Sequence, residues 1–224
     1  MSALSPAVPA ATRVALSAEG LAHRYGARRG LDPVSFALGA PGVVAVTGAN
    51  GSGKSTLLRI LVGLLRPTEG VTTLALGGST VPPAARRAVM GFASPELHFY
   101  DEFGAAENLE FAAEARGLAR PRDAAREALE RVGLLERAGD RVTALSSGMR
   151  QRLRLAFALL HRPPVLLLYE PGSHLDEEGR RAVERLVAAQ GREGLVLIAT
   201  NEPREWALAE QRIELRGRGL GGPA

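Results

Sequence analysis

The chain is organised around the stretch Gly48-Ala49-Asn50-Gly51-Ser52-Gly53-Lys54-Ser55-Thr56. It matches the pattern G-x-x-x-x-G-K-[ST] at every fixed position. The apolar run 43–46 before it predicts a buried strand, and the leucines and isoleucine of 57–64 predict a helix that leaves it. This strand–loop–helix context is the one in which the pattern indicates a phosphate-binding loop.

The residue types of this loop suit the phosphates of a nucleotide. Glycines let the backbone curl so that N–H groups at the start of the helix point at phosphate oxygens. Lys54 then places a compact charge on the β- and γ-phosphates, and the Ser55 hydroxyl would ligate Mg²⁺. Lys54 is the single lysine among 28 basic residues, which indicates that a planar guanidinium would fit poorly there. All nine loop residues are therefore candidates for binding ATP, and a glycine-rich turn without a nucleotide is the disfavoured alternative.

The composition is that of a globular protein with one large domain, or with a core and a subdomain. The 224 residues carry a formal charge of +4, but no run of five or six like charges occurs, so we expect no nucleic-acid partner. The absence of cysteine from the sequence excludes disulfides, thiolate metal sites and cysteine nucleophiles. Residues 3–11 lack the basic start of a signal peptide, and no apolar run approaches the ~18 residues that span a bilayer. We therefore expect a cytoplasmic chain, unless a partner holds it at a membrane.

Hydrophobic periodicity and glycine positions predict the order of helices and strands. The predicted strands are 14–16, 34–38, 43–46, 71–76, 165–168, 195–199 and 212–215. The predicted helices are 57–64, 107–115, 122–132, 146–160 and 178–189. The run 165–168 is continuously apolar, which is typical of the middle of a parallel sheet.

These elements predict an α/β fold: a P-loop NTPase core with a mainly parallel sheet, an N-terminal antiparallel β part and a helical subdomain insert. We expect a single domain over residues 1–224. The expected parts are a core of 12–91 and 155–216, a helical subdomain of 92–154, and flexible ends of 1–11 and 217–224.

An aromatic residue, Tyr25, lies about twenty residues ahead of the phosphate loop, between the first two predicted strands. A ring at that place would stack on an adenine, a contact that contributes about 1–3 kcal/mol in other base-stacking sites. The alternative is an ordinary packed tyrosine at a turn.

Taken in order, these motifs resemble those of the ATP-binding subunit of ABC transporters over nearly the whole chain. The run Leu145-Ser146-Ser147-Gly148-Met149 stands where that family has its LSGGQ signature, and Ser146 is a suitable N-cap for the helix that follows. The resemblance implies that Ser146 and Gly148 face the γ-phosphate of an ATP held by an opposite subunit. It also implies that Asp176, at the end of Ser173-His174-Leu175-Asp176, contacts that subunit. The expected ATP-bound state is thus a head-to-tail homodimer.

The end of the strand 165–168 departs from the family pattern. The family has Asp-Glu-Pro after four apolar residues, whereas this chain has Tyr169-Glu170-Pro171. The resemblance gives Glu170 the role of the general base that polarises the attacking water. Tyr169, a neutral phenol near neutral pH, replaces the aspartate that organises the Mg²⁺ shell.

Two further positions also differ from the family. No glutamine occurs where its glutamine loop is expected, near Ser94-Pro95-Glu96, so Glu96 is the nearest substitute ligand. Asn201 stands where the switch histidine would contact the γ-phosphate; an asparagine can donate a hydrogen bond but cannot carry a proton charge. The parts that hold ATP are therefore retained, while three parts that organise water and metal are altered.

The resemblance implies a membrane partner, a transmembrane permease subunit that docks beside the glutamine loop. The segment 97–103 puts three aromatic residues in a turn-like stretch, which would suit such a surface. The alternative is that these rings pack under the helical insert. His98 is expected at the surface, and the other histidines, His23, His161 and His174, have no metal-ligand spacing.

The sequence thus predicts an ABC-type ATPase, peripheral on the inner face of the cell membrane, that uses Mg-ATP slowly to drive a transporter. One alternative is an ATP-gated dimerising module with little hydrolysis, and another is a soluble ABC protein acting on nucleic acid or ribosomes. Details around Arg150 and Asn201 also resemble haem-exporter-type ATP-binding subunits.

Overall fold

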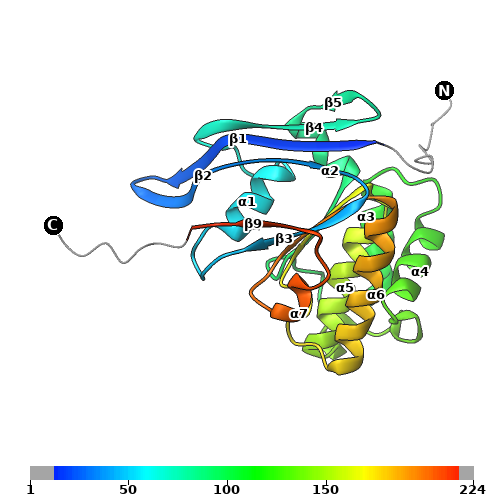
Figure 1. Cartoon of the computed structure of the whole chain (residues 1–224). Helices are drawn as coiled ribbons and strands as arrows, with labels where there is room; N and C mark the ends of the chain where they lie inside the picture. Colours follow the sequence, from blue (N-terminus) through cyan, green and yellow to red (C-terminus); the bar gives the residue numbers. More distant parts are fainter. Residues whose placement is uncertain (1–12, 217–224) are drawn as a thin grey trace, which may run out of the picture.

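A computed structural model describes residues 13–216, so both predicted flexible ends, 1–11 and 217–224, lie outside the described residues (Figure 1). The strands are β1 (Val14–Tyr25), β2 (Arg28–Gly39), β3 (Gly42–Thr47), β4 (Glu69–Leu76), β5 (Ser79–Val81), β6 (Met90–Ala93), β7 (Val165–Tyr169), β8 (Leu195–Ala199) and β9 (Gln211–Glu214). The α-helices are α1 (Lys54–Leu61), α2 (Arg86–Val89), α3 (Ala105–Ala115), α4 (Pro121–Arg131), α5 (Ser147–Leu159), α6 (Glu177–Glu193) and α7 (Pro203–Trp206). Short 3₁₀ turns cover Pro83–Ala85, Leu135–Arg137 and Val142–Ala144.

A parallel sheet forms the centre of the molecule, with strand order β6-β7-β8-β3-β9. Its inner strands β3, β7 and β8 are almost entirely apolar because both faces are covered, whereas the edge strand β9 is mostly polar and exposed. In β7, Val165 and Leu167 pack on the side of α1, while Leu166 and Leu168 pack on the side of α5 and α6. The alternation of side chains along one strand therefore builds two cores, one on each face of the sheet.

The second sheet is antiparallel, with order β2-β1-β4-β5, and covers the α1 side of the parallel sheet. Its strands β1 and β2 are much longer than the predicted runs 14–16 and 34–38. The pairing of β1 with β2 shifts register between Ala18 and Arg24, which interrupts the alternation on which the sequence prediction relied. Strands β5 and β6 and the short helices α2 and α7 were not predicted.

The helices α3, α4, α5 and α6 gather on the other face of the parallel sheet, as Figure 1 shows. Strand β6 ends at Ala93 and pairs with β7, so the sheet extends slightly past the boundary expected at residue 92. No helix within residues 13–216 combines the length and the apolar composition that crossing a bilayer requires.

The strands β3, β7 and β8 are neighbours and run in the same direction. Their carboxyl ends therefore meet at one edge of the sheet, where α/β proteins bind ligands. These ends lead into the phosphate loop, into Glu170 and into Asn201. The topology thus collects three candidate segments that are far apart in the sequence.

A buried arginine ties α1 to the antiparallel sheet. The Arg86 guanidinium is 1% exposed and donates hydrogen bonds to Leu61 O at 3.3 Å and to Thr72 O at 2.7 Å. We predict that Arg86→Ala lowers the free energy of unfolding by about 2–4 kcal/mol, because two carbonyl groups lose their donor and a cavity forms. Urea unfolding measures this value. The neighbouring exposed Arg87→Ala is the control and should change it by less than about 0.5 kcal/mol; an equal effect of both substitutions would contradict the prediction.

Candidate nucleotide-binding site

The backbone of the phosphate loop requires glycine at its key positions. Gly48 and Gly53 have φ values of 145° and 101°, in the region that glycine favours. A Cβ on Gly53 would lie 2.5 Å from Gly30 O, and one on Gly48 would lie 2.7 Å from Ser52 Oγ. Helix α1 begins directly at Lys54 without a side-chain cap, and the buried Ser52 Oγ has no hydrogen-bond partner. The loop therefore offers polar groups at a helix start, which fits an anion such as a phosphate.

The Lys54 ammonium lies inside this loop. It donates hydrogen bonds to Gly48 O at 2.6 Å, to Ala49 O at 3.3 Å and to Asn201 Oδ1 at 3.1 Å. Burial lowers the pKa of Lys54, while the negative charge of Glu170 opposes this effect. The charged amine is thus held at the mouth of the loop by oxygens from two strand ends.

Asn201 is brought to the loop by the pairing of β8 with β3. Its amide oxygen accepts from Lys54, and its amide nitrogen donates to Asn50 Oδ1 at 2.8 Å. Thr200 N–H donates to Val46 O at 3.1 Å, which continues the sheet up to this point. The residue that the sequence analysis placed at the γ-phosphate therefore lies beside the loop.

The end of β7 carries Tyr169 and Glu170 next to these groups. Glu170 has a left-handed backbone, with a φ of 47°, which is rare for a non-glycine residue and occurs often at functional sites. Its N–H donates to Ala199 O at 2.8 Å. Burial and the charges of Glu170 and Glu96 raise the pKa of Tyr169 above its ordinary value, so the phenol is neutral at neutral pH.

Glu96 forms an ion pair with Arg59 of α1. The hydrogen bond from Arg59 to Glu96 raises the pKa of the guanidinium. The carboxylate suggested as a substitute metal ligand is thus already neutralised by a cation of the phosphate-loop helix. Within residues 13–216 no cluster of three or more His, Asp or Glu side chains could hold a metal ion. Ser55 remains the residue that is expected to hold a Mg²⁺ ion accompanying a nucleotide.

Tyr25 lies at the end of β1, against the start of α1. Its hydroxyl is 3.4 Å from Thr56 Oγ1, its ring meets the His23 ring edge-on at 4.5 Å, and the residue is 43% exposed. An aromatic side chain thus stands partly open to solvent beside the phosphate loop.

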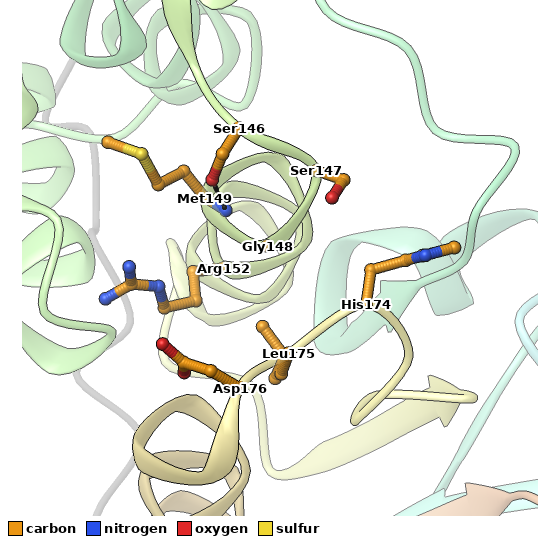
Figure 2. A pocket seen from close by; sticks show the side chains of 8 residues that line it. All are labelled: Ser146, Ser147, Gly148, Met149, Arg152, His174, Leu175 and Asp176. Atoms are coloured by element: carbon orange, nitrogen blue, oxygen red, sulfur yellow. Dashed lines mark hydrogen bonds between the residues drawn. The ribbon is translucent and has the colours of Figure 1, made fainter.

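A second cluster surrounds a shallow cavity of about 150 Å³ between the start of α5 and the segment before α6 (Figure 2). Ser146 Oγ accepts from Met149 N–H at 3.2 Å and caps α5, while Asp176 Oδ1 accepts from Gly179 N–H at 2.8 Å and caps α6. A Cβ on Gly148 would lie 3.0 Å from a backbone oxygen across the cavity. The lining residues are Ser146, Ser147, Gly148, Met149, Arg152, His174, Leu175 and Asp176. None of them hydrogen-bonds to residues 48–56 in the described chain, so the predicted site residues form two separate groups.

Three polar residues near Glu170 were not singled out in the sequence. Gln151 and Glu205 are 2% and 6% exposed, and each hydrogen-bonds to the backbone just after β7. Arg154 donates to Gln151 and to Leu97 O. Gln151 shares a helix face with the buried Leu155 and Leu159, so a polar residue on an apolar stripe was the signal available. Glu205 lies in a short helix without any such pattern.

Comparison with known proteins agrees with this geometry. The sequence pattern described as "ABC transporter" matches residues 31–173. The chain belongs to the ABC transporter family. The lipoprotein-releasing system ATP-binding protein LolD of Nitratidesulfovibrio vulgaris is 42% identical over 77% of this chain and 78% of that protein.

Other members of the ABC family match the chain over more of its length. The uncharacterized ABC transporter ATP-binding protein YxlF of Bacillus subtilis is 39% identical, over 83% of this chain. The aliphatic sulfonates import ATP-binding protein SsuB 1 of Burkholderia cenocepacia is 36% identical, over 92% of this chain. The chain spans 62% of each of these two proteins.

A solved structure shares the fold: the dimeric post-hydrolysis state of the ATP-binding cassette MJ0796 with ADP and Pi. Its TM-score is 0.80 at 22% identity, and the match covers 91% of this chain and 97% of that one. The predicted ABC ATPase family and the α/β P-loop fold are therefore confirmed. The roles of the individual site residues, the division into subdomains and the resemblance to haem-exporter subunits stay predictions.

The buried Glu205 gives a pH-dependent prediction. Its Oε1 accepts from Gly172 N–H at 2.8 Å, and burial raises the pKa of the carboxyl. Because the folded pKa exceeds the unfolded value, protonation favours folding: the contribution is full below the unfolded pKa of about 4.3 and is lost as the pH rises through the folded pKa. Glutamine keeps the acceptor and never ionises. Glu205→Gln should therefore raise the Tm relative to the parent at pH 8 and much less at pH 4.

Thermal unfolding at several pH values measures this difference. The exposed Glu178→Gln serves as the matched control and should give a small, nearly constant difference. A Glu205→Gln difference that stays the same from pH 4 to pH 8 would contradict a raised pKa.

Proposed function

We propose that this chain is the ATP-binding subunit of an ABC transporter and that it hydrolyses ATP slowly, in a head-to-tail dimer, to drive a separate membrane subunit. The observation that carries the proposal is the convergence of the phosphate loop, Glu170 and Asn201 at one sheet edge, with Lys54 between them. Family membership supports ATP as the nucleotide.

In this proposal, different groups of the chain bind the nucleotide and take part in its hydrolysis. The N–H groups of the loop and the Lys54 ammonium bind the β- and γ-phosphates, and the Tyr25 ring stacks on the adenine. Glu170 accepts a proton from the attacking water, and Asn201 donates a hydrogen bond to the γ-phosphate. Ser55 is the residue that would hold Mg²⁺, which when bound supplies positive charge to the phosphate oxygens.

The cavity beside α5 supports the dimer part of the proposal. Ser146 and Gly148 stand at the start of a 13-residue helix, where backbone N–H groups attract an anion, and Asp176 lies across from them. This group is separate from the phosphate loop of the same chain. It would therefore contact the ATP bound in the phosphate loop of a second copy, and the same group of that copy would contact the ATP bound here.

An exposed aromatic patch, defined as Tyr100, Phe103 and Phe111, supports a membrane partner. These residues are 54%, 45% and 51% exposed, and the Tyr100 ring lies 5.5 Å from Phe103 and 5.7 Å from Phe111. Of the rings expected to pack under the insert, Phe99 does so, against Phe157 at 6.2 Å. Clustered exposed rings are typical of protein interfaces, so we assign this patch to the permease subunit at the inner face of the membrane.

The second candidate function is an ATP-gated dimerising module with little hydrolysis. The observation that favours it is Tyr169, which puts a neutral, partly buried ring where a carboxylate would organise the metal shell. Loss of one such electrostatic contact commonly costs 10²–10³ in rate. The rate of ATP turnover therefore distinguishes a subunit that drives transport from an ATP-gated dimerising module.

ATP binding through the loop is tested at Lys54. Lys54→Ala should weaken ATP binding at least about tenfold, because charge-assisted hydrogen bonds contribute roughly 1.5–3 kcal/mol each. Isothermal titration measures the Kd. The exposed Arg66→Ala removes one positive charge beyond the far end of α1 and serves as the control. If Lys54→Ala binds ATP like the parent, the loop is not the nucleotide site.

The role of Tyr169 is tested by restoring the carboxylate. Tyr169→Asp should raise steady-state phosphate release at saturating Mg-ATP at least about tenfold, because the Mg²⁺ shell regains an anionic neighbour. Tyr169→Phe keeps the ring without its hydroxyl and should turn over like the parent. A parent that already releases several phosphates per second, with no gain in Tyr169→Asp, would show that Tyr169 does not limit the rate.

A further inference from the structure

Two polar side chains of α5 connect the segment after β6 with the segment after β7. Gln151 Nε2 donates hydrogen bonds to Glu170 O at 3.2 Å and to Pro171 O at 3.1 Å. Arg154, one turn further along, donates to Gln151 Oε1 at 3.2 Å and to Leu97 O at 3.1 Å. The backbone after β6 and the backbone after β7 are thus joined by a continuous chain of hydrogen bonds.

We propose that Arg154 and Gln151 form a relay through which the segment 97–103 sets the backbone position of Glu170. They are positioning residues, since neither is part of the phosphate loop or the cavity beside α5. The proposal rests on the proposed function for its consequence, because it makes the aromatic patch a surface from which a partner adjusts hydrolysis.

The Gln151 end of the relay is held tightly. The residue is 2% exposed, and both hydrogens of its amide group are used by the two carbonyl oxygens, while its own oxygen accepts from Arg154. Glu170 needs such support because a non-glycine residue disfavours the left-handed backbone conformation. The surrounding contacts must therefore hold Glu170 in it. A buried amide without these partners would be costly, so a shift of Gln151 moves the Glu170 carbonyl with it.

The Arg154 end is fixed to the segment that carries the aromatic patch. Leu97 N–H donates to Ser94 O at 3.1 Å, and the Phe99 ring packs against Phe157, three residues along α5 from Arg154. Tyr100, a member of the patch, is three residues from Leu97 and is anchored by its own N–H to Asn108 Oδ1 at 2.8 Å. A partner that binds at Tyr100 would therefore displace the Leu97 carbonyl and alter the hydrogen bonds that Arg154 donates to Leu97 O and Gln151 Oε1.

The planar guanidinium matters for this arrangement. It presents several N–H donors in a rigid fork, so one side chain can hold Leu97 O and Gln151 Oε1 together. A lysine ammonium has the charge but lacks the fixed spread of donors. The conservative substitution therefore separates the charge of Arg154 from its geometry.

Hydrogen exchange of the full chain without nucleotide tests the relay. In Arg154→Met, amides in both 96–103 and 169–173 should exchange about fivefold faster or more, since each segment contains protected N–H groups. Arg154→Lys should show a smaller increase in both segments. Arg116→Met is the matched control: Arg116 also donates to a backbone carbonyl, Arg87 O at 2.9 Å, and its loss should leave 169–173 unchanged.

An increase confined to 96–103 in Arg154→Met, or no increase in either segment, overturns the proposal. If Arg154→Met does not fold, the Arg154→Lys comparison decides by the same criterion. Turnover adds a second measurement: Arg154→Met should lower kcat about tenfold or more while the Kd for ATP stays within about twofold. A parent without any ATP turnover would refute the proposed function. The hydrogen-exchange result would still test the relay, because it is measured without nucleotide.

Discussion

The Lys54 ammonium is held by carbonyl oxygens from the loop after β3 and by an amide oxygen from the segment after β8. This contact exists only because β3 and β8 pair in parallel, with Val46 opposite Ala199. The same sheet places β7 on the other side of β8, so Glu170 comes close enough for its charge to act on Lys54. One constraint, the parallel order of three apolar strands, therefore brings the phosphate loop, Glu170 and Asn201 together at a single edge.

Charge around this edge is distributed in an unusual way for a site that uses a metal. The last position of β7, which is expected to carry a carboxylate, holds the neutral Tyr169, and the nearby Glu96 is paired with Arg59. Glu205, another acid close to Glu170, is buried and has a raised pKa. Positive charge for binding phosphates is thus retained, while negative charge for organising a cation is reduced. In the function proposed above, this imbalance lowers turnover more than nucleotide binding, because the transition state depends more strongly than ATP binding on the geometry of the metal shell.

Helix α5 contributes to both groups of residues. Its first turn, capped by Ser146, lines the cavity with Asp176, while Gln151 and Arg154 lie along its length and reach the backbone beyond β7 and β6. Since α5 packs against the sheet through Leu155 and Leu159, it forms a rigid element between the aromatic patch and the sheet edge that carries Glu170. A single helix therefore links the cavity-lining residues, the segment that carries the aromatic patch and Glu170.

Local patterns in the sequence were sufficient to predict the phosphate loop and the apolar strands 165–168 and 195–199. They also predicted the helices 107–115 and 122–132, which end just before Gly117 and Gly133. These features depend on residues close together in the chain, where periodicity and glycine act directly. Strand β6 and the full length of β1 were missed because sheet pairing, and not local alternation, defines them.

The partners of the site residues were decided only by the tertiary structure. Asn201 on Lys54, Arg59 on Glu96 and Gln151 under Glu170 join segments that are 147, 37 and 19 positions apart. The physical reason is that strand order and helix packing decide which of these distant segments meet in space. The residue spacing within a single motif does not determine either of them.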